Sequence, residues 1–119
     1  MAKKKGSARG AQRQDNQPWD LKPASAKAKR EWDDAKAREP DLIEKVRERL
    51  TTRPLDRSDN PRRTHTLKGS LGHKWVGDQK LSVWQHEFTS GGRVWYCPDR
   101  NAHIVWLVMI TLSHPKETD

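Results

Sequence analysis

The first half of the chain carries hydrophobic residues at the spacing of amphipathic helices. Residues 24–38 are rich in good helix formers. Their apolar positions recur every three or four residues: Ala24, Ala28, Trp32 and Ala35. A second helix is predicted to begin at Pro40 and to end before Pro54. Its apolar stripe consists of Leu42, Ile43, Val46 and Leu50.

Because the connection between these helices is so short, they are predicted to form an antiparallel hairpin. Their charged faces are interpreted as solvated surface. Residues 19–23, which precede the first helix, form a candidate edge strand.

After a polar loop at residues 56–63, the pattern changes to that of β-strands. Residues 64–71 are a candidate strand, and residues 81–89 alternate. One predicted face of this second segment holds Trp84, His86 and Phe88, and the other holds Val83, Gln85 and Glu87. A Ser-Gly-Gly turn leads to a strand at 93–97, and a turn at 98–101 leads to a long apolar strand.

That last segment, residues 104–112, is predicted to be a central strand buried on both faces. The order of an early strand, two helices and three or four antiparallel strands predicts an α+β fold. The helical hairpin is expected to pack on one face of a small, mostly antiparallel sheet.

The charge of the chain is unevenly distributed. The 119 residues hold 24 Lys and Arg against 16 Asp and Glu, a net charge of +8. Residues 1–13 contribute five basic side chains and no acid, residues 14–68 contribute 14 basic and 11 acidic, and residues 69–119 contribute five of each.

Residues 1–17 are predicted to be a disordered basic tail, which supplies phosphate contacts or is merely a solubilising end. Residues 18–119 are predicted to form a single domain, and nucleic acid is the first partner that the charge suggests.

Several classes of protein find no support in the sequence. It has no run of about 18 apolar residues and no secretory signal. Its single Cys97 cannot form an internal disulfide. A cytoplasmic protein without membrane contact is therefore expected. No Gly-rich phosphate loop is present, and no cofactor is expected. The five histidines lack ligand spacing, so no metal site is predicted: His65, His73, His86, His103 and His114.

Four short segments occur in a fixed order in the second half of the chain. They are LKGSL at 67–71, WQHEFT at 84–89, GRVWY at 92–96 and, after the apolar strand, SHPKET at 113–118. Over residues 18–119 this order resembles the RelE/ParE superfamily of type II toxin–antitoxin toxins. The resemblance implies a RelE-like fold and a toxin neutralised by a cognate antitoxin. Many members are metal-independent endoribonucleases (mRNA interferases) that inhibit translation, often on the ribosome, whereas the ParE branch inhibits DNA gyrase.

Metal-independent RNA cleavage needs a base for the ribose 2′-OH, positive charge at the phosphate and an acid for the leaving oxygen. The resemblance implies that Arg93 binds the phosphate and that His114 acts as an acid or base, with Lys116 adding positive charge beside it. It also suggests catalytic roles for His86 and Glu87. These two neighbours point to opposite faces of one strand, so only one of them can face the site.

Four further residues are candidate RNA contacts. Lys68 and His65 lie on the segment that precedes the alternating strand. Tyr96 and Trp95 face opposite ways, so one belongs in the core while the other can stack on a base; a slip of one residue in register exchanges them.

Each candidate also has an alternative interpretation. Arg93 is also typical of a solvated strand start, His86 of the margin of a core, and Glu87 of a cross-strand ion pair. The charge balance of residues 69–119, and the lack of a tyrosine in residues 115–119, depart from the nuclease pattern.

Three functions therefore remain open from the sequence. The first is an endoribonuclease toxin that acts on RNA, alone or on the ribosome. The second is a ParE-like gyrase inhibitor without nuclease activity, and the third is a non-catalytic basic nucleic-acid-binding protein. For either kind of toxin, a groove beside the helical hairpin is the expected dock for the antitoxin.

Overall fold

A computed structural model describes residues 17–58 and 62–113 of the chain. The predicted basic tail lies outside the described residues except for Gln17, whose backbone carbonyl accepts a hydrogen bond of 3.0 Å from Nε2 of His103. His114 and Lys116 also lie outside the described residues. Within the described part, no helix is long and apolar enough to cross a membrane.

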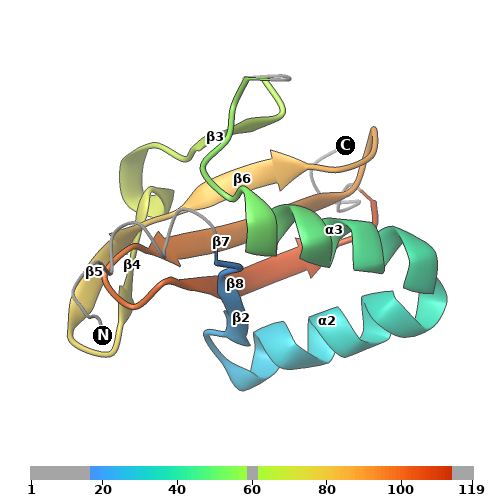
Figure 1. Ribbon diagram of the computed structural model, residues 1–119, viewed down its shortest axis with the longest axis horizontal. Helices are drawn as coiled ribbons and strands as arrows, with labels where there is room; N and C mark the ends of the chain where they lie inside the picture. Colours follow the sequence, from blue (N-terminus) through green and yellow to red (C-terminus); the bar gives the residue numbers. More distant parts are fainter. Residues whose placement is uncertain (1–16, 59–61, 114–119) are drawn as a thin grey trace, which may run out of the picture.

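Two helices form the predicted hairpin (Figure 1). Helix α2 (Ala26–Arg38) begins after Ser25, whose hydroxyl oxygen accepts a hydrogen bond from the Ala28 backbone N–H at 3.1 Å. Helix α3 (Pro40–Thr52) begins at Pro40, where the missing N–H costs nothing. Glu39 alone separates the helices, since it is both the C-cap of α2 and the N-cap of α3.

Five strands make a mixed sheet in the order β2-β8-β7-β6-β3. They are β2 (Asp20–Pro23), β3 (Thr64–Thr66), β6 (Trp84–Glu87), β7 (Arg93–Asp99) and β8 (Ile104–Thr111). The edge strand β2 runs parallel to β8, and the other three pairs are antiparallel. The sheet is therefore mostly antiparallel, as the sequence predicts.

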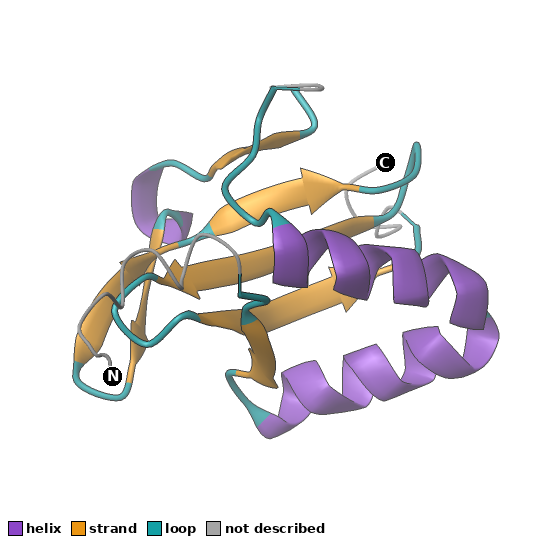
Figure 2. Ribbon diagram, viewed as in Figure 1, coloured by secondary structure: helices purple, strands orange, loops and turns teal. Residues whose placement is uncertain are grey.

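The hydrophobic core lies between the two helices and one face of this sheet (Figure 2). The helices contribute five buried side chains: Ala28, Ala35, Ile43, Val46 and Leu50. The strands contribute five more: Val94, Tyr96, Val105, Leu107 and Ile110. The predicted α+β class is confirmed, and so is most of each predicted helical stripe. Two predicted members differ: Ala24 precedes α2, and Leu42 is only half-buried.

A second, two-stranded sheet was not predicted. Strands β4 (His73–Val76) and β5 (Gln79–Ser82) form a hairpin that stands at the opposite end of the molecule from the α2–α3 connection (Figure 1). The candidate strand at 64–71 is correspondingly shorter. It becomes β3 followed by a 3₁₀ turn, η1 (Gly69–Leu71). The predicted strand at 81–89 is divided between β5 and β6.

The apolar strand β8 differs in burial from the prediction. It lies inside the sheet, between β2 and β7, but only one of its faces is fully buried. Trp106, Val108 and Met109 are half-buried, because no helix of the described part covers the face to which they belong.

Candidate functional site: the open face of the sheet

Strand register determines which side chains lie on the face that the helices leave uncovered, here called the open face. Val94 and Tyr96 are fully buried beneath the helices, so Arg93 and Trp95 belong to the opposite face of β7. Cross-strand partners share a face of the sheet. The partners of these two residues on β6 and β8 are therefore on the open face: Glu87, Gln85, Thr111 and Met109.

β8 contains one extra residue, which changes the side-chain alternation between its first and second halves. Trp95 pairs with Met109 while Tyr96 pairs with Leu107, so Val108 is the additional residue of a bulge. The bulge lets Leu107 and Ile110 both enter the core although they are three residues apart. As a result Met109 lies on the open face, which simple alternation along β8 would not have predicted.

Arg93 and Glu87 form the charged centre of the open face. They are directly opposed across β6 and β7, which places their Cβ atoms about 5 Å apart. Both side chains are half-buried. The backbone N–H of Glu87 donates a 2.8 Å hydrogen bond to the carbonyl of Arg63, which holds the end of β6 against the segment before β3. A carboxylate and a guanidinium are thus held on neighbouring strands, where they can accept a proton and bind a phosphate.

Trp95 lies next to this pair, and its indole orientation is held by Gln85. The indole Nε1–H donates a 2.8 Å hydrogen bond to the Gln85 side-chain oxygen. Gln85 pairs in turn with His65 on β3, so His65 lies on the open face as well. Nδ1 of His65 is 3.1 Å from the Thr66 carbonyl, which can only accept, so Nδ1 carries the proton in that bond. An aromatic ring and an imidazole therefore border the charged pair.

The remaining sequence candidates are placed differently. Lys68 is exposed and precedes η1, beyond the end of β3. The open face thus brings together Arg93, Glu87, Trp95 and His65. The prediction of site residues missed Gln85, Thr111 and Met109. The alternation that assigns Glu87 to one face could have identified Gln85.

His86 does not share the open face, because it pairs with the buried residues Thr64 and Val94. Its Nδ1 lies 2.8 Å from the Thr64 hydroxyl oxygen, which also accepts a 3.2 Å hydrogen bond from Nη2 of Arg49. The same nitrogen of Arg49 donates to the Asp56 carbonyl. His86 is thus part of a polar network that joins α3 to the sheet. Of the two neighbours that the sequence places on opposite faces, Glu87 is therefore the one that shares the open face with Arg93.

Tyr96 belongs to the core, so its predicted role in stacking on RNA is also corrected. Its side chain is fully buried, and its hydroxyl donates a 2.7 Å hydrogen bond to the Pro54 carbonyl. Burial raises the pKa of Tyr96 far above its usual value. Of the two residues that the sequence left open, Tyr96 is thus the one in the core, and Trp95 belongs to the open face.

The β4–β5 hairpin covers one end of the open face. The Gln79 side-chain amide of β5 donates a 3.1 Å hydrogen bond to the carboxylate of Asp99, which Nε1 of Trp106 also approaches at 3.4 Å. Cys97 lies on this face too, yet it is fully buried, and burial raises the pKa of its thiol to about 11. The accessible part of the open face is therefore the end that holds Glu87, Arg93 and Trp95.

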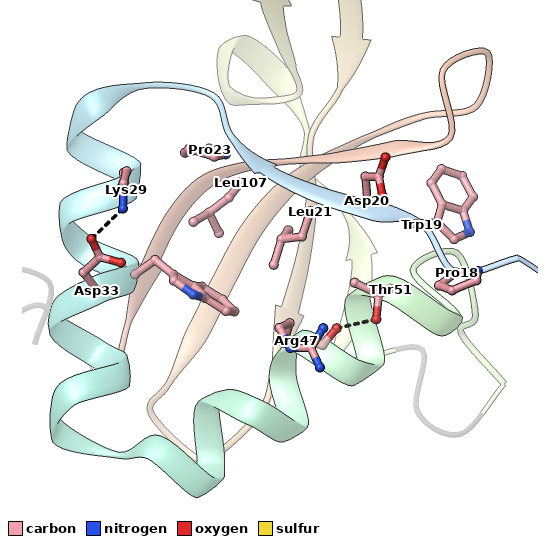
Figure 3. Close-up of a pocket in the computed structure, with 11 residues that line it drawn as sticks. Pro18, Trp19, Asp20, Leu21, Pro23, Lys29, Asp33, Arg47, Thr51 and Leu107 are labelled. Carbon is pink, nitrogen blue, oxygen red and sulfur yellow. Dashed lines mark hydrogen bonds and ion pairs between the residues drawn. The ribbon is translucent and has the colours of Figure 1, made fainter.

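A separate groove of about 520 Å³ runs between β2 and the helical hairpin. Figure 3 shows Leu21 and Leu107 at its floor, Lys29 and Asp33 of α2 on one side, and Arg47 of α3 on the other. Lys29 and Asp33 form an ion pair of 2.8 Å at the rim. The groove is therefore apolar at its base and charged at its edge, and it lies along the edge strand of the sheet.

Among residues 17–58 and 62–113, no three His, Cys, Asp or Glu side chains are grouped as a metal site would require. No protein-family model, curated protein or solved structure matches the chain. Its function is therefore inferred from the chemistry of the open face and the groove.

Proposed function

We propose that the protein is a RelE/ParE-type toxin, a metal-independent endoribonuclease that cleaves mRNA on the open face of its sheet and so inhibits translation. One observation carries the proposal: Arg93, Glu87 and Trp95 all belong to the face that the helices leave uncovered. All three are candidates from the sequence. Glu87 offers a base, Arg93 a group that binds phosphate, and Trp95 an aromatic surface for stacking. A base, a phosphate ligand and a stacking surface are what RNA cleavage at this face would need.

In the proposed reaction, the Glu87 carboxylate accepts the proton of a ribose 2′-OH. The 2′-oxygen then forms a bond to the adjacent phosphorus while the bond to the 5′-oxygen breaks. The Arg93 guanidinium binds two of the phosphate oxygens and stabilises the negative charge that builds on them. Protonation of the 5′-oxygen gives a 5′-hydroxyl and a 2′,3′-cyclic phosphate. His114, which follows β8 in the chain, is the proposed donor of that proton, with Lys116 as additional positive charge.

The proposed antitoxin would bind in the groove between β2 and the helical hairpin. Support comes from the apolar floor at Leu21 and Leu107 and from the position of β2 at the edge of the sheet. An edge strand can pair with an extended segment, and an apolar groove can accept hydrophobic side chains of the same segment. Such a partner would bind on the helix side of the sheet while RNA binds on the open face.

Induced expression of residues 1–119 in bacterial cells tests the catalytic proposal. Growth arrest is expected together with new transcript ends, mapped by primer extension on total RNA. Arg93→Ala should relieve both effects, and Arg93→Lys should restore only part of the activity, because an ammonium cannot bind two phosphate oxygens in a fixed plane. Arg30→Ala on the exposed face of α2 is the matched control, since it removes the same charge away from the open face.

Purified protein tests the same proposal in solution. Cleavage of a single-stranded RNA should continue in the presence of EDTA and should produce 2′,3′-cyclic phosphate ends. Growth arrest by Arg93→Ala with intact transcripts would contradict the proposed mechanism. Arrest accompanied by DNA breaks and unbroken mRNA would instead favour gyrase as the target.

A further inference from the structure

The β4–β5 hairpin presents an exposed face whose composition is unusual for a protein surface. Its residues alternate between half-buried and exposed along both strands. The inner face, toward the sheet, holds Lys74, Val76, Gln79 and Leu81. The outer face holds His73, Trp75, Lys80 and Ser82. This outer face is here called the hairpin platform.

Trp75 is the central residue of the platform. Its side chain is 64% exposed, and only one other large hydrophobic side chain of the described residues, Leu71 at 56%, is comparably exposed. Lys80 lies directly across from Trp75 on the neighbouring strand. His73, two residues before Trp75 in β4, lies on the same face. A large aromatic surface is thus kept in water next to positive charge, although burying it would stabilise the fold.

Defined contacts at its turn and at its base hold the hairpin in place. A two-residue loop of Gly77 and Asp78 connects its strands, and Gly77 has a φ of +62°, which glycine adopts without strain. At its base, the Val83 N–H donates to the Gly72 carbonyl at 2.9 Å. A Cβ at Gly72 would lie 2.8 Å from the Leu67 carbonyl oxygen, so this close approach requires glycine.

The charge of the surrounding segment indicates what the platform binds. Residues 68–82, which include the hairpin and the turn before it, contain three Lys residues and one acid, Asp78. Aromatic rings beside positive charge are the features by which proteins bind single-stranded nucleic acid without reading its sequence.

The platform is also connected to the open face. Gln79, on the inner face of β5, bonds to Asp99 at the far end of the same strand that carries Arg93. Asp99 lies six residue steps along β7 from Arg93, a distance of about 20 Å along the strand. An RNA strand held at Arg93 can therefore extend along β7 toward the hairpin.

We propose that the hairpin platform is a second RNA contact, in which Trp75 stacks on a base and Lys80 binds a phosphate of the single strand whose scissile bond lies at Arg93. This inference rests on the proposed function for the identity of the ligand. It adds to that function a binding surface outside the catalytic face, which would strengthen substrate affinity without taking part in bond cleavage.

Fluorescence anisotropy with the full chain tests this proposal directly. The probe is a short single-stranded RNA of mixed sequence, labelled with fluorescein and carrying 2′-O-methyl groups, so that no 2′-OH is available for cleavage. Trp75→Ala should weaken binding by about 5- to 150-fold, the usual range for the loss of one stacked base. Trp75→Phe should retain most of the affinity, whereas Trp75→Leu should not, since it preserves apolar area but not an aromatic face.

Lys80→Ala tests the phosphate contact. It should lower affinity and reduce the slope of log K against log salt by about 0.7, the value for one phosphate contact on a single strand. Lys45→Ala, which removes an exposed charge on α3, is the matched control and should change neither quantity appreciably. Trp75 and Lys80 are both exposed, so these variants should fold normally, which a thermal melt verifies.

The outcomes separate this proposal from the proposed catalytic function. Normal RNA affinity in Trp75→Ala and Lys80→Ala would overturn the platform proposal, even if Arg93→Ala abolished cleavage. Weaker binding by these variants in a protein that cleaves no RNA would support the platform and contradict the nuclease. Loss of a dimer in Trp75→Ala with unchanged RNA affinity would identify the platform as a contact between copies of the chain and would also overturn the proposal.

Discussion

Glu87 and Arg93 are directly opposed on β6 and β7, on the face of the sheet away from both helices. Their immediate neighbours in sequence, His86 and Val94, are opposed in the same way on the other face. Two adjacent pairs of residues therefore have different surroundings. One pair lies on an uncovered surface, and the other contributes to the packing of helices against the sheet.

Glu87→Gln should lower the rate of RNA cleavage by about 100- to 10,000-fold, the usual contribution of a general base. The amide has nearly the same shape but cannot accept the proton of the 2′-OH. Single-turnover cleavage of a saturating RNA measures this effect, and urea unfolding should show little change in stability. An unchanged cleavage rate would remove Glu87 from the proposed mechanism.

His86→Ala should have the opposite effect. It removes the contact between Nδ1 and the Thr64 hydroxyl and should lower the free energy of unfolding by about 1–3 kcal/mol. The cleavage rate of the folded protein should remain normal, because the side chain belongs to the helix-covered face. A large loss of cleavage with unchanged stability would restore His86 as a catalytic candidate.

Tyr96→Phe removes a single buried hydroxyl. The Pro54 carbonyl would lose its 2.7 Å hydrogen bond, and the free energy of unfolding should fall by about 1–3 kcal/mol. RNA affinity should not change, since the ring remains in the core and does not reach the open face. Chemical denaturation and anisotropy measure the two quantities on the same sample. A drop in RNA affinity without loss of stability would contradict the assignment to the core.

Asp99→Asn tests the anchor between the hairpin and the sheet. Burial by itself raises the pKa of Asp99, but hydrogen bonds from the Ala102 N–H, the Gln79 amide and the Trp106 indole outweigh it and lower the pKa below its usual value of 3.8. A carboxyl whose pKa is lowered on folding stabilises the protein above its unfolded pKa, and this stabilisation is lost as the pH falls through the folded pKa.

Asp99→Asn should therefore be less stable than the parent at pH 7, and the difference should shrink below about pH 4. Urea unfolding of both proteins between pH 7 and pH 3 measures this difference in stability. Asp34→Asn, at an exposed position of α2, serves as the control. A difference in stability that stayed constant down to pH 3 would show that the charge of Asp99 does not stabilise the fold.

Local signals in the sequence predicted much of the fold. The three- and four-residue spacing of Ala28, Trp32 and Ala35 indicates a helix that buries one stripe, and Pro40 indicates where the next helix begins. These features act over one or two turns of the chain and do not depend on distant residues. The prediction was accordingly correct for α2 and α3.

The β4–β5 hairpin shows where such local signals are insufficient. Each strand has four residues, and its inner face includes Lys74 and Gln79 beside Val76 and Leu81. The difference between its faces arises from packing against β7 and Asp99, not from a clear separation of apolar and polar residues. A strand whose pattern is this weak becomes recognisable only when its neighbours are in place.

For the candidate site, the sequence alone determined that Glu87 and His86 face opposite ways, and likewise Trp95 and Tyr96, because side chains alternate along any β-strand. It could not determine which residue of each pair lies beneath the helices. That choice depends on which face of β7 packs against Ile43, Val46 and Leu50, residues more than 40 positions away in the chain. Only the tertiary structure brings those surfaces together, and it thereby assigns Glu87, Arg93 and Trp95 to one uncovered face.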